Sequence, residues 1–178
     1  MPRHIALLRG VNLGSHNRVK MAELREVLTR AGYEDVRTLV NSGNVVLTSP
    51  EAPAAVERDV ARLLADELGV DTPVMVRTRD ELADVIARCP YPEADERPKH
   101  VHVTFLNGEV HGERVATLKE MDFGEEAFEV SGRELFAWHP NGLGRSELAK
   151  ELAKGAGPDG TSRNWNTVTK LLALADGK

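Results

Sequence analysis

The chain has 178 residues, of which 41% are hydrophobic and 29% charged, and this composition excludes a wholly disordered protein. No apolar run approaches the roughly 18 residues of a membrane span, and the first residues lack the apolar stretch of a signal peptide. The single cysteine, Cys89, excludes an internal disulfide and a Cys-rich zinc site. We therefore expect a soluble, cytoplasmic protein without a membrane partner.

The formal net charge of −5 is unevenly distributed along the chain. Residues 1–48 carry +3, residues 49–140 carry −10 and residues 141–178 carry +2. The first acidic residue, Glu23, comes only after Arg3, Arg9, Arg18 and Lys20. The net charge argues against a general nucleic-acid coat. The pattern has two interpretations: variation over a solvated surface, or one positive concavity built from both chain ends to hold an anion.

The first half of the chain has the apolar periodicity of an alternating strand and helix pattern. It predicts strands at 5–8, 36–40, 45–48 and 73–77, and helices at 21–31 and 53–68. A third helix is expected after Thr78, which has capping-box spacing with Glu81, and Pro90 stops it. The order strand, helix, strand, strand, helix, strand is the ferredoxin-like arrangement.

The second half begins the same order again after a Pro-rich and acidic connector. Its elements are predicted as a strand at 101–106, a helix at 113–121, strands at 127–130 and 134–138, a helix at 146–154, a flexible Gly/Pro stretch at 155–160 and a closing helix from Trp165. We therefore predict an α+β protein with two ferredoxin-like (α/β-plait) subdomains, the second degenerate, and a C-terminal helix. The expected segments are a first subdomain with its connecting helix at 1–89, a linker at 90–99 and a second subdomain at 100–178.

Two polar loops of the first subdomain are expected to lie together. In a ferredoxin-like unit the first and second strands run parallel, so the loop at 10–20 and the hairpin at 41–44 emerge at the same end of the sheet. The start of the following helix and its flanking cations suit an anion there, and the amides add neutral donors and acceptors. The candidate ligand-binding residues are Arg9, Asn12, Asn17, Arg18, Lys20, Asn41, Ser42 and Asn44. Each loop alone also fits a simple turn, because Asn, Ser and Gly suit turn dihedrals.

Three separated motifs resemble a known family. The first motif is Leu8-Arg-Gly-Val-Asn-Leu-Gly14, followed by Asn17 and Val19-Lys-Met21. The second is Asn41-Ser-Gly-Asn-Val45, and the third is Arg163-Asn-Trp-Asn-Thr-Val168. In this order, and over essentially the whole chain, they resemble the bacterial domain of unknown function family 1697. The resemblance implies two α/β-plait subdomains and no established activity.

The third motif adds Arg163, Asn164 and Asn166 to the candidate ligand-binding residues. Two interpretations are open for this helix start. Asn164 is the N-cap of the last helix with Trp165 packed beneath it, or the helix start packs against the first loop and completes a pocket.

Several other polar features are interpreted as structural. His100 and His102 share a strand face but lack a third ligand, so we expect a hydrogen-bonded or solvated pair and no metal site. Acidic residues are expected to form a solvated rim at Asp122, Glu125, Glu126 and Glu129. Most aromatic residues of the second half are expected to pack in its core rather than to stack on bases.

The function that these residues favour is binding of a phosphate-bearing ligand, either a nucleotide or a nucleic acid, at the basic Asn/Gly-rich loops. Two alternatives stay open. One is an enzyme acting on a small anionic substrate, with Lys20 as a charge stabiliser and no assignable general base. The other is a protein-interaction module that uses an exposed apolar patch. The sequence names no cofactor and no reaction.

Overall fold

The computed structural model describes residues 1–178, and its contacts divide the chain into two compact units. The first unit comprises Met1–Asp84 and Lys170–Lys178, and the second comprises Val85–Thr169. Residues 85–89 thus group with the second unit and the end of the last helix with the first. The expected organisation into domains at 1–89 and 100–178 with a linker stays a prediction. None of the helices has the length and apolar character of a membrane span.

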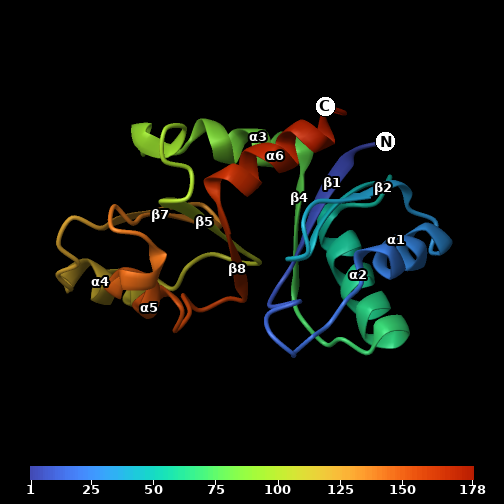
Figure 1. Ribbon diagram of the computed structural model, residues 1–178, viewed down its shortest axis with the longest axis horizontal. Coiled ribbons are helices and arrows are strands. Elements are labelled where there is room, and N and C mark those ends of the chain that lie inside the picture. Colours follow the sequence, from blue (N-terminus) through green and yellow to red (C-terminus); the bar gives the residue numbers. More distant parts are fainter. The chain divides into compact units, whose positions relative to one another are not determined.

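The first unit is an antiparallel four-stranded sheet with the strand order β2-β3-β1-β4. Its elements are β1 (Arg3–Leu8), α1 (Met21–Arg30), β2 (Glu34–Thr38), β3 (Asn44–Thr48), α2 (Pro53–Leu68) and β4 (Val74–Thr78), and α3 (Arg79–Ala87) follows (Figure 1). This is the predicted ferredoxin-like order. The expected capping box at the start of α3 is confirmed, because Thr78 N–H donates to Glu81 Oε2 (2.8 Å) and Glu81 N–H donates to Thr78 Oγ1 (3.1 Å).

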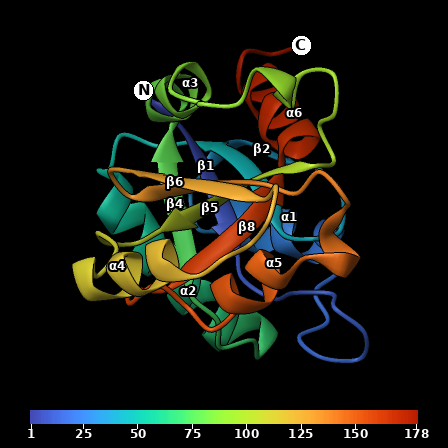
Figure 2. The ribbon, with the colours of Figure 1, turned by 90° about the vertical axis from the view of Figure 1, so that its left-hand side faces the viewer.

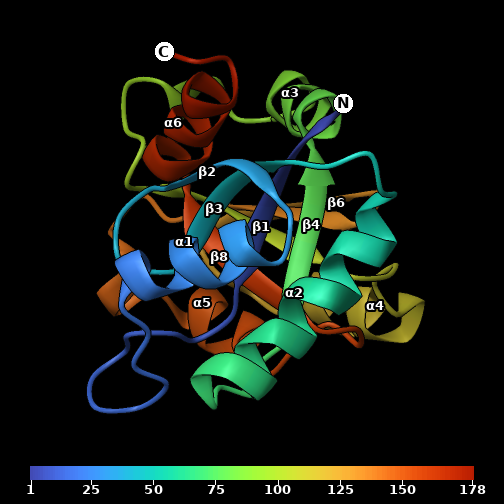
Figure 3. The same ribbon diagram turned by 90° about the vertical axis from the view of Figure 1, so that its right-hand side faces the viewer.

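Helices α1 and α2 cover the same face of this sheet (Figure 3). Successive strand residues point to opposite faces, so alternate positions of β1 and β3 meet the helices. The core between them is formed by buried aliphatic side chains, which include Ala6, Leu8, Leu24, Leu28, Val45, Leu47, Val60 and Leu64. The predicted period of apolar residues on α1 and α2 follows from this one-sided packing.

The second unit repeats the complete plait. Its elements are β5 (Val101–Leu106), α4 (Gly112–Glu120), β6 (Ala127–Ser131), β7 (Glu134–Trp138), α5 (Glu147–Leu152) and β8 (Gly160–Asn164), with 3₁₀ turns at Pro92–Ala94 and Leu143–Arg145. Helix α6 (Trp165–Ala175) begins in this unit and ends in the first. The strand order is β6-β7-β5-β8. Helices α4 and α5 lie on one side of this sheet (Figure 2) and pack on a core that includes Leu118, Phe128, Leu135 and Leu148.

Strand β8 is absent from the sequence-based prediction, which placed a flexible stretch before the last helix. The segment Gly160–Asn164 has no apolar run that would indicate a strand. It pairs along β5, with Gly160 opposite Leu106. A side chain at Gly160 would place a Cβ 2.5 Å from Leu106 Cδ2 and 3.1 Å from the Phe105 carbonyl oxygen, so glycine lets the strand pack closely here.

The same backbone hydrogen bonds close the loops in each of the two plaits. Their paired bonds are Leu8 N–H to Gly43 O (2.8 Å) with Leu106 N–H to Arg133 O (2.9 Å), and Arg9 N–H to Pro73 O (3.2 Å) with Asn107 N–H to Asp159 O (3.0 Å). Their registers correspond as well, since His4 lies opposite Thr78 and His102 lies opposite Asn164. The chain is therefore a structural repeat, although its sequence shows no residue-level repeat.

Candidate functional site

The loop at 9–20 and the hairpin at 41–44 meet at one end of the first sheet. Leu8 N–H donates to Gly43 O (2.8 Å), and Asn12 Nδ2 donates to Asn41 O (2.6 Å). Gly43 has a φ of 84°, and a Cβ there would lie 2.7 Å from Leu8 Cβ and from Val11 Cγ2. Only glycine combines that backbone conformation with such a close approach. The predicted juxtaposition of the two segments is confirmed.

Two buried valines anchor the loop and leave the segment between them exposed. Val11 and Val19 are 1% and 5% exposed and belong to the core of the first unit, whereas residues 13–18 are all exposed. The chain turns back on itself with left-handed backbone at Gly10, Asn12, Gly14 and Asn17. Glycine and asparagine are the residue types that adopt this conformation at the lowest cost. The segment projects from the end of the sheet in Figure 3.

The side chain of Asn12 holds this loop together. Its Nδ2 donates to Val19 O (2.8 Å) as well as to Asn41 O, and its Oδ1 accepts from Val19 N–H (2.8 Å). One side chain thus closes the loop and joins it to the hairpin. Asn17 makes a longer contact, from Nδ2 to Gly10 O (3.4 Å).

Asn44 requires a correction to the sequence-based expectation. Its side chain is fully buried, and Nδ2 donates to Leu39 O (3.0 Å) and to Ser42 Oγ (2.9 Å). Because the amide nitrogen of Asn44 is buried and donates both bonds within the hairpin, this side chain stabilises the turn and is not placed to contact a ligand. Asn12 likewise uses its amide within the protein. The side chain of Asn41, in contrast, is exposed and has no hydrogen-bond partner in the protein.

Two cations of the loop point into solvent without a partner. Arg18 and Lys20 are exposed and form no hydrogen bond or ion pair through their side chains. Arg9 is exposed too, and its backbone is fixed by Pro73 O and by Thr72 Oγ1, which donates to Arg9 O (2.6 Å). Because no acidic residue precedes Glu23, the charge of this loop is uncompensated within its own segment.

The C-terminal candidates lie in the second unit. Arg163 is 8% exposed and donates to Thr161 Oγ1 (2.6 Å) and Ser162 O (2.9 Å), and its burial lowers the pKa of the guanidinium to about 10. It is not the open phosphate contact that we expected. Asn164 Oδ1 accepts from Thr167 N–H (2.9 Å), so this residue caps α6, with Trp165 buried behind it. A site that Arg163, Asn164 and Asn166 share with the first loop stays a prediction.

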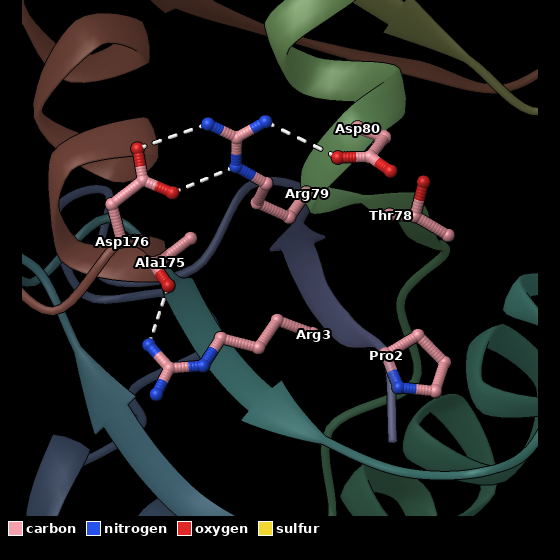
Figure 4. Close-up of a pocket in the computed structure, with 7 residues that line it drawn as sticks. All are labelled: Pro2, Arg3, Thr78, Arg79, Asp80, Ala175 and Asp176. Atoms are coloured by element: carbon pink, nitrogen blue, oxygen red, sulfur yellow. Dashed lines mark hydrogen bonds and ion pairs between the residues drawn. The ribbon is translucent and has the colours of Figure 1, made fainter.

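A pocket of about 250 Å³ lies at the opposite end of the first sheet, where β1 begins and β4 ends. Figure 4 shows the Arg79 guanidinium between two carboxylates. It contacts Asp176 (2.7 and 3.1 Å) and Asp80 (3.1 Å), while Arg3 donates to Ala175 O and pairs with Asp35 (3.1 Å). The hydrogen bonds from Arg79 hold the pKa of Asp176 below its usual value. The cations of this pocket are already neutralised, so it offers an anion less than the loop does.

A buried polar cluster of the second unit escaped the sequence analysis. His139 is 1% exposed, and its Nδ1 lies 2.8 Å from Glu126 Oε2 and 2.8 Å from Ser146 Oγ, which also donates to Glu126. Glu126 is thus a partner of buried groups and not part of a solvated rim. The sequence signal was weak because these residues come from two connections, Glu126 from the one before β6 and the other two from the one between β7 and α5.

The arrangement of this cluster is structural. In a Ser-His-acid triad the serine and the acid use different imidazole nitrogens, whereas here both lie at Nδ1 of His139. Ser146 also caps α5 by accepting from Ala149 N–H (2.8 Å). His102 stacks edge-on at 5.4 Å from His139, and burial, followed by the charges of His139 and His100, lowers its pKa to about 4. No group of three or more His, Cys, Asp or Glu side chains is placed to hold a metal ion.

These features define a class: a two-plait α+β protein with an exposed cationic loop on its first plait. The chain belongs to the family described as protein of unknown function DUF1697, whose model matches residues 1–136. The solved structure of a conserved bacterial protein from Streptococcus pneumoniae is similar over 98% of each chain, with a TM-score of 0.81 and 23% sequence identity. That likeness shows the fold. No curated protein matches the chain in sequence.

Proposed function

We propose that the loop at 9–20, together with the hairpin at 41–44, binds a phosphate-bearing ligand, a nucleotide or a nucleic acid. The observation that carries this proposal is the pair of exposed cations, Arg18 and Lys20, which have no partner on a segment without acids. Guanidinium and ammonium groups with free donors are the side chains that recognise phosphate oxygens most strongly. The exposed amide of Asn41 supplies a neutral donor and acceptor beside them.

The loop is held ready for such a ligand. Asn12, Val11 and Val19 fix both of its ends, so binding does not have to order the whole segment. A preorganised loop loses less conformational entropy on binding, and that saving appears as affinity.

Binding is better supported than catalysis. The alternative of an enzyme on a small anionic substrate needs a positioned general base. No carboxylate lies in the first 22 residues, and the imidazole of His16 in the loop is exposed with no side chain to orient it. The alternative of a protein-interaction module rests on the exposed apolar side chains Leu13 and Val40, which adjoin the bonded pair Asn12 and Asn41 in sequence.

The test is a thermal-shift titration with nucleotides, sugar phosphates and short RNA and DNA at low and moderate salt. Arg18→Ala and Lys20→Ala remove unpartnered side chains, so both variants keep the native melting temperature. Arg58→Ala on α2 removes an equally exposed and unpartnered cation and is the matched control. We expect at least one ligand to raise the melting temperature of the wild type and of Arg58→Ala, with a smaller rise in the two loop variants. No rise with any phosphate-bearing ligand, or an equal loss in Arg58→Ala, contradicts the proposal.

A further inference from the structure

Two exposed aliphatic side chains flank the hydrogen bond that joins the loop to the hairpin. Leu13 follows Asn12 and is 65% exposed, and Val40 precedes Asn41 and is 59% exposed. Single exposed aliphatic residues are common and need no explanation. These two are brought to the same Asn12–Asn41 bond from segments far apart in the sequence, and the side chain of Asn12 also bonds Val19, which lies between the unpartnered Arg18 and Lys20.

Val40 is also held in an unfavourable backbone conformation. Its φ of 50° lies in the left-handed region, where a β-branched residue is a genuine outlier. Asparagine or glycine would adopt this conformation at lower cost. The chain therefore keeps an exposed valine at a position where both local strain and solvation favour another residue.

We propose that the ligand of this loop is a single-stranded nucleic acid, whose phosphates contact Arg18 and Lys20 and whose bases contact Leu13 and Val40. This inference rests on the proposed function and narrows its ligand. A single strand alternates charged phosphates with flat, largely apolar bases, and these two joined segments expose both cations and aliphatic side chains. In a duplex the bases are stacked and paired, and their faces are closed to these side chains.

The exposure of the loop favours a polymer over a mononucleotide. Small ligands are held in concave sites that bury most of their surface. Residues 13–18 are all exposed, so the loop itself encloses nothing. A polymer gains affinity from several weak contacts in a row and does not need such enclosure.

The same surface is a poor membrane anchor. Leu13 and Val40 together carry less hydrocarbon than one myristoyl chain, which by itself gives only marginal binding. The polar residues Ser15, Asn17 and Asn41 of the same two segments are exposed as well, and they have to be desolvated to enter a bilayer interface. An amide beside an aliphatic side chain suits a base, which offers both a polar edge and an apolar face.

The test compares two polymers that differ only in their bases. A fluorescent single strand of about 12 nucleotides, within the usual site sizes of single-strand binders, is titrated beside an abasic strand of the same length. RNA and DNA versions of the strand are used, and a duplex of the same sequence and vesicles of anionic phospholipid are added as competitors. The variants are Leu13→Ser, Val40→Gly, Arg18→Ala and, as control, Arg58→Ala.

We expect the wild type and Arg58→Ala to prefer the base-containing strand to the abasic strand. Leu13→Ser and Val40→Gly each weaken binding of the base-containing strand about three- to tenfold, as expected for an aliphatic contact, and leave the abasic strand unchanged. Arg18→Ala weakens both strands and lowers the slope of log affinity against log salt by about 0.7. Val40→Gly relieves the left-handed strain, so its melting temperature does not fall, and lost affinity in this variant is not lost folding.

Equal binding of the two strands, both weakened by Arg18→Ala, overturns this inference and leaves the proposed function standing. Binding of neither strand overturns the inference, and the proposed function then depends on the smaller phosphates. If vesicles displace the strand from the wild type and bind Leu13→Ser more weakly, the inference is overturned in favour of a membrane surface. If an unlabelled duplex displaces the fluorescent strand as well as an unlabelled single strand does, the proposed contact between the aliphatic side chains and the base faces is wrong.

Discussion

The two plaits build the same frame and carry different loops on it. In both, the last residue of the first strand donates to the hairpin between the second and third strands, at Gly43 in one plait and Arg133 in the other. The segment at 9–20 is long, basic and free of acids, whereas its counterpart at 107–111 is short and contains Glu109. The backbone topology thus gives both plaits the same loop positions, and the two loops differ in length and charge.

The largest expected effect comes from the glycine that lets the hairpin approach the first loop. Gly43→Ala places a Cβ 2.7 Å from Leu8 Cβ and Val11 Cγ2 in a backbone with a φ of 84°. We expect a loss of about 2–4 kcal/mol in the free energy of unfolding, measured by chemical denaturation. Gly132→Ala in the second hairpin has a φ of 62° but no atom within 4 Å, so it costs about 1 kcal/mol. Equal losses in the two variants contradict the steric part of this explanation.

The next largest effect is expected at Asn12, whose side chain closes the long loop of the first plait, whereas no side chain has this role in the short loop of the second. Asn12→Ala removes two donated hydrogen bonds and one accepted bond, and it leaves the carbonyl groups of Val19 and Asn41 without this partner. We expect a loss of about 2 kcal/mol, together with faster amide exchange in residues 10–20. The control is Asn107→Ala in the short loop, where only the backbone of the asparagine is bonded, to Asp159 O. That variant is expected to keep wild-type stability, and a comparable loss there refutes the special role of Asn12.

The next prediction concerns the pH dependence of stability and His102, which has the register position in the second sheet that His4 has in the first. His102 packs against His139, and its pKa in the folded protein is about 4, below the ordinary value of 6.5. The folded state therefore favours neutral His102. Its contribution to stability is complete above pH 6.5 and is lost as the pH falls towards 4, by at most about 1.4 kcal/mol per pH unit.

Unfolding by denaturant between pH 7 and pH 4 measures this loss, and His102→Gln is expected to remove it. Burial raises the pKa of Glu126, but the hydrogen bonds from Ser146, His139 and Leu148 N–H outweigh burial and hold that pKa below its usual value. Its contribution is present above the ordinary carboxyl pKa and is lost only below it. An unchanged slope between pH 6.5 and 5 in His102→Gln assigns the effect to another group.

The sequence predicts much of this fold because the signals are local. The apolar periods of α1 and α2, the Asn-Ser-Gly-Asn hairpin and the pair Thr78 and Glu81 all act over a few residues. Strand β8 was missed because Gly160–Asn164 is short and polar, and its pairing with β5 is a long-range contact that local periodicity does not reveal. Long-range packing supplies the evidence for this strand, and a short polar segment carries none of it.

The juxtaposition of the two loops was predicted correctly, whereas a ligand site at these loops stays a prediction. Strand topology placed the two loops together, and the charge pattern indicated Arg18 and Lys20. The sequence cannot tell an asparagine that turns inward from one that turns outward, so Asn44 and Asn41 were grouped although one is fully buried and the other exposed. The exposure of Val40 was missed because apolar periodicity placed it in a strand at 36–40, whereas β2 ends at Thr38, and nothing in the sequence marks Leu13 as exposed.

The smallest expected effect concerns the residues that follow β4 and β8. Arg79 and Trp165 are the first residues of α3 and α6, and one lies at the surface while the other is buried. Trp165 Nε1 donates to Asp95 Oδ1 (3.1 Å), whereas Arg79 forms a two-pronged pair with Asp176 in solvent. Arg79→Ala and Asp176→Ala, compared in a double-mutant cycle, are expected to show a weak favourable coupling that disappears at high salt, because exposed ion pairs are screened. Coupling that persists at high salt contradicts this expectation and shows instead that the Arg79–Asp176 pair stabilises the end of α6 against the start of α3.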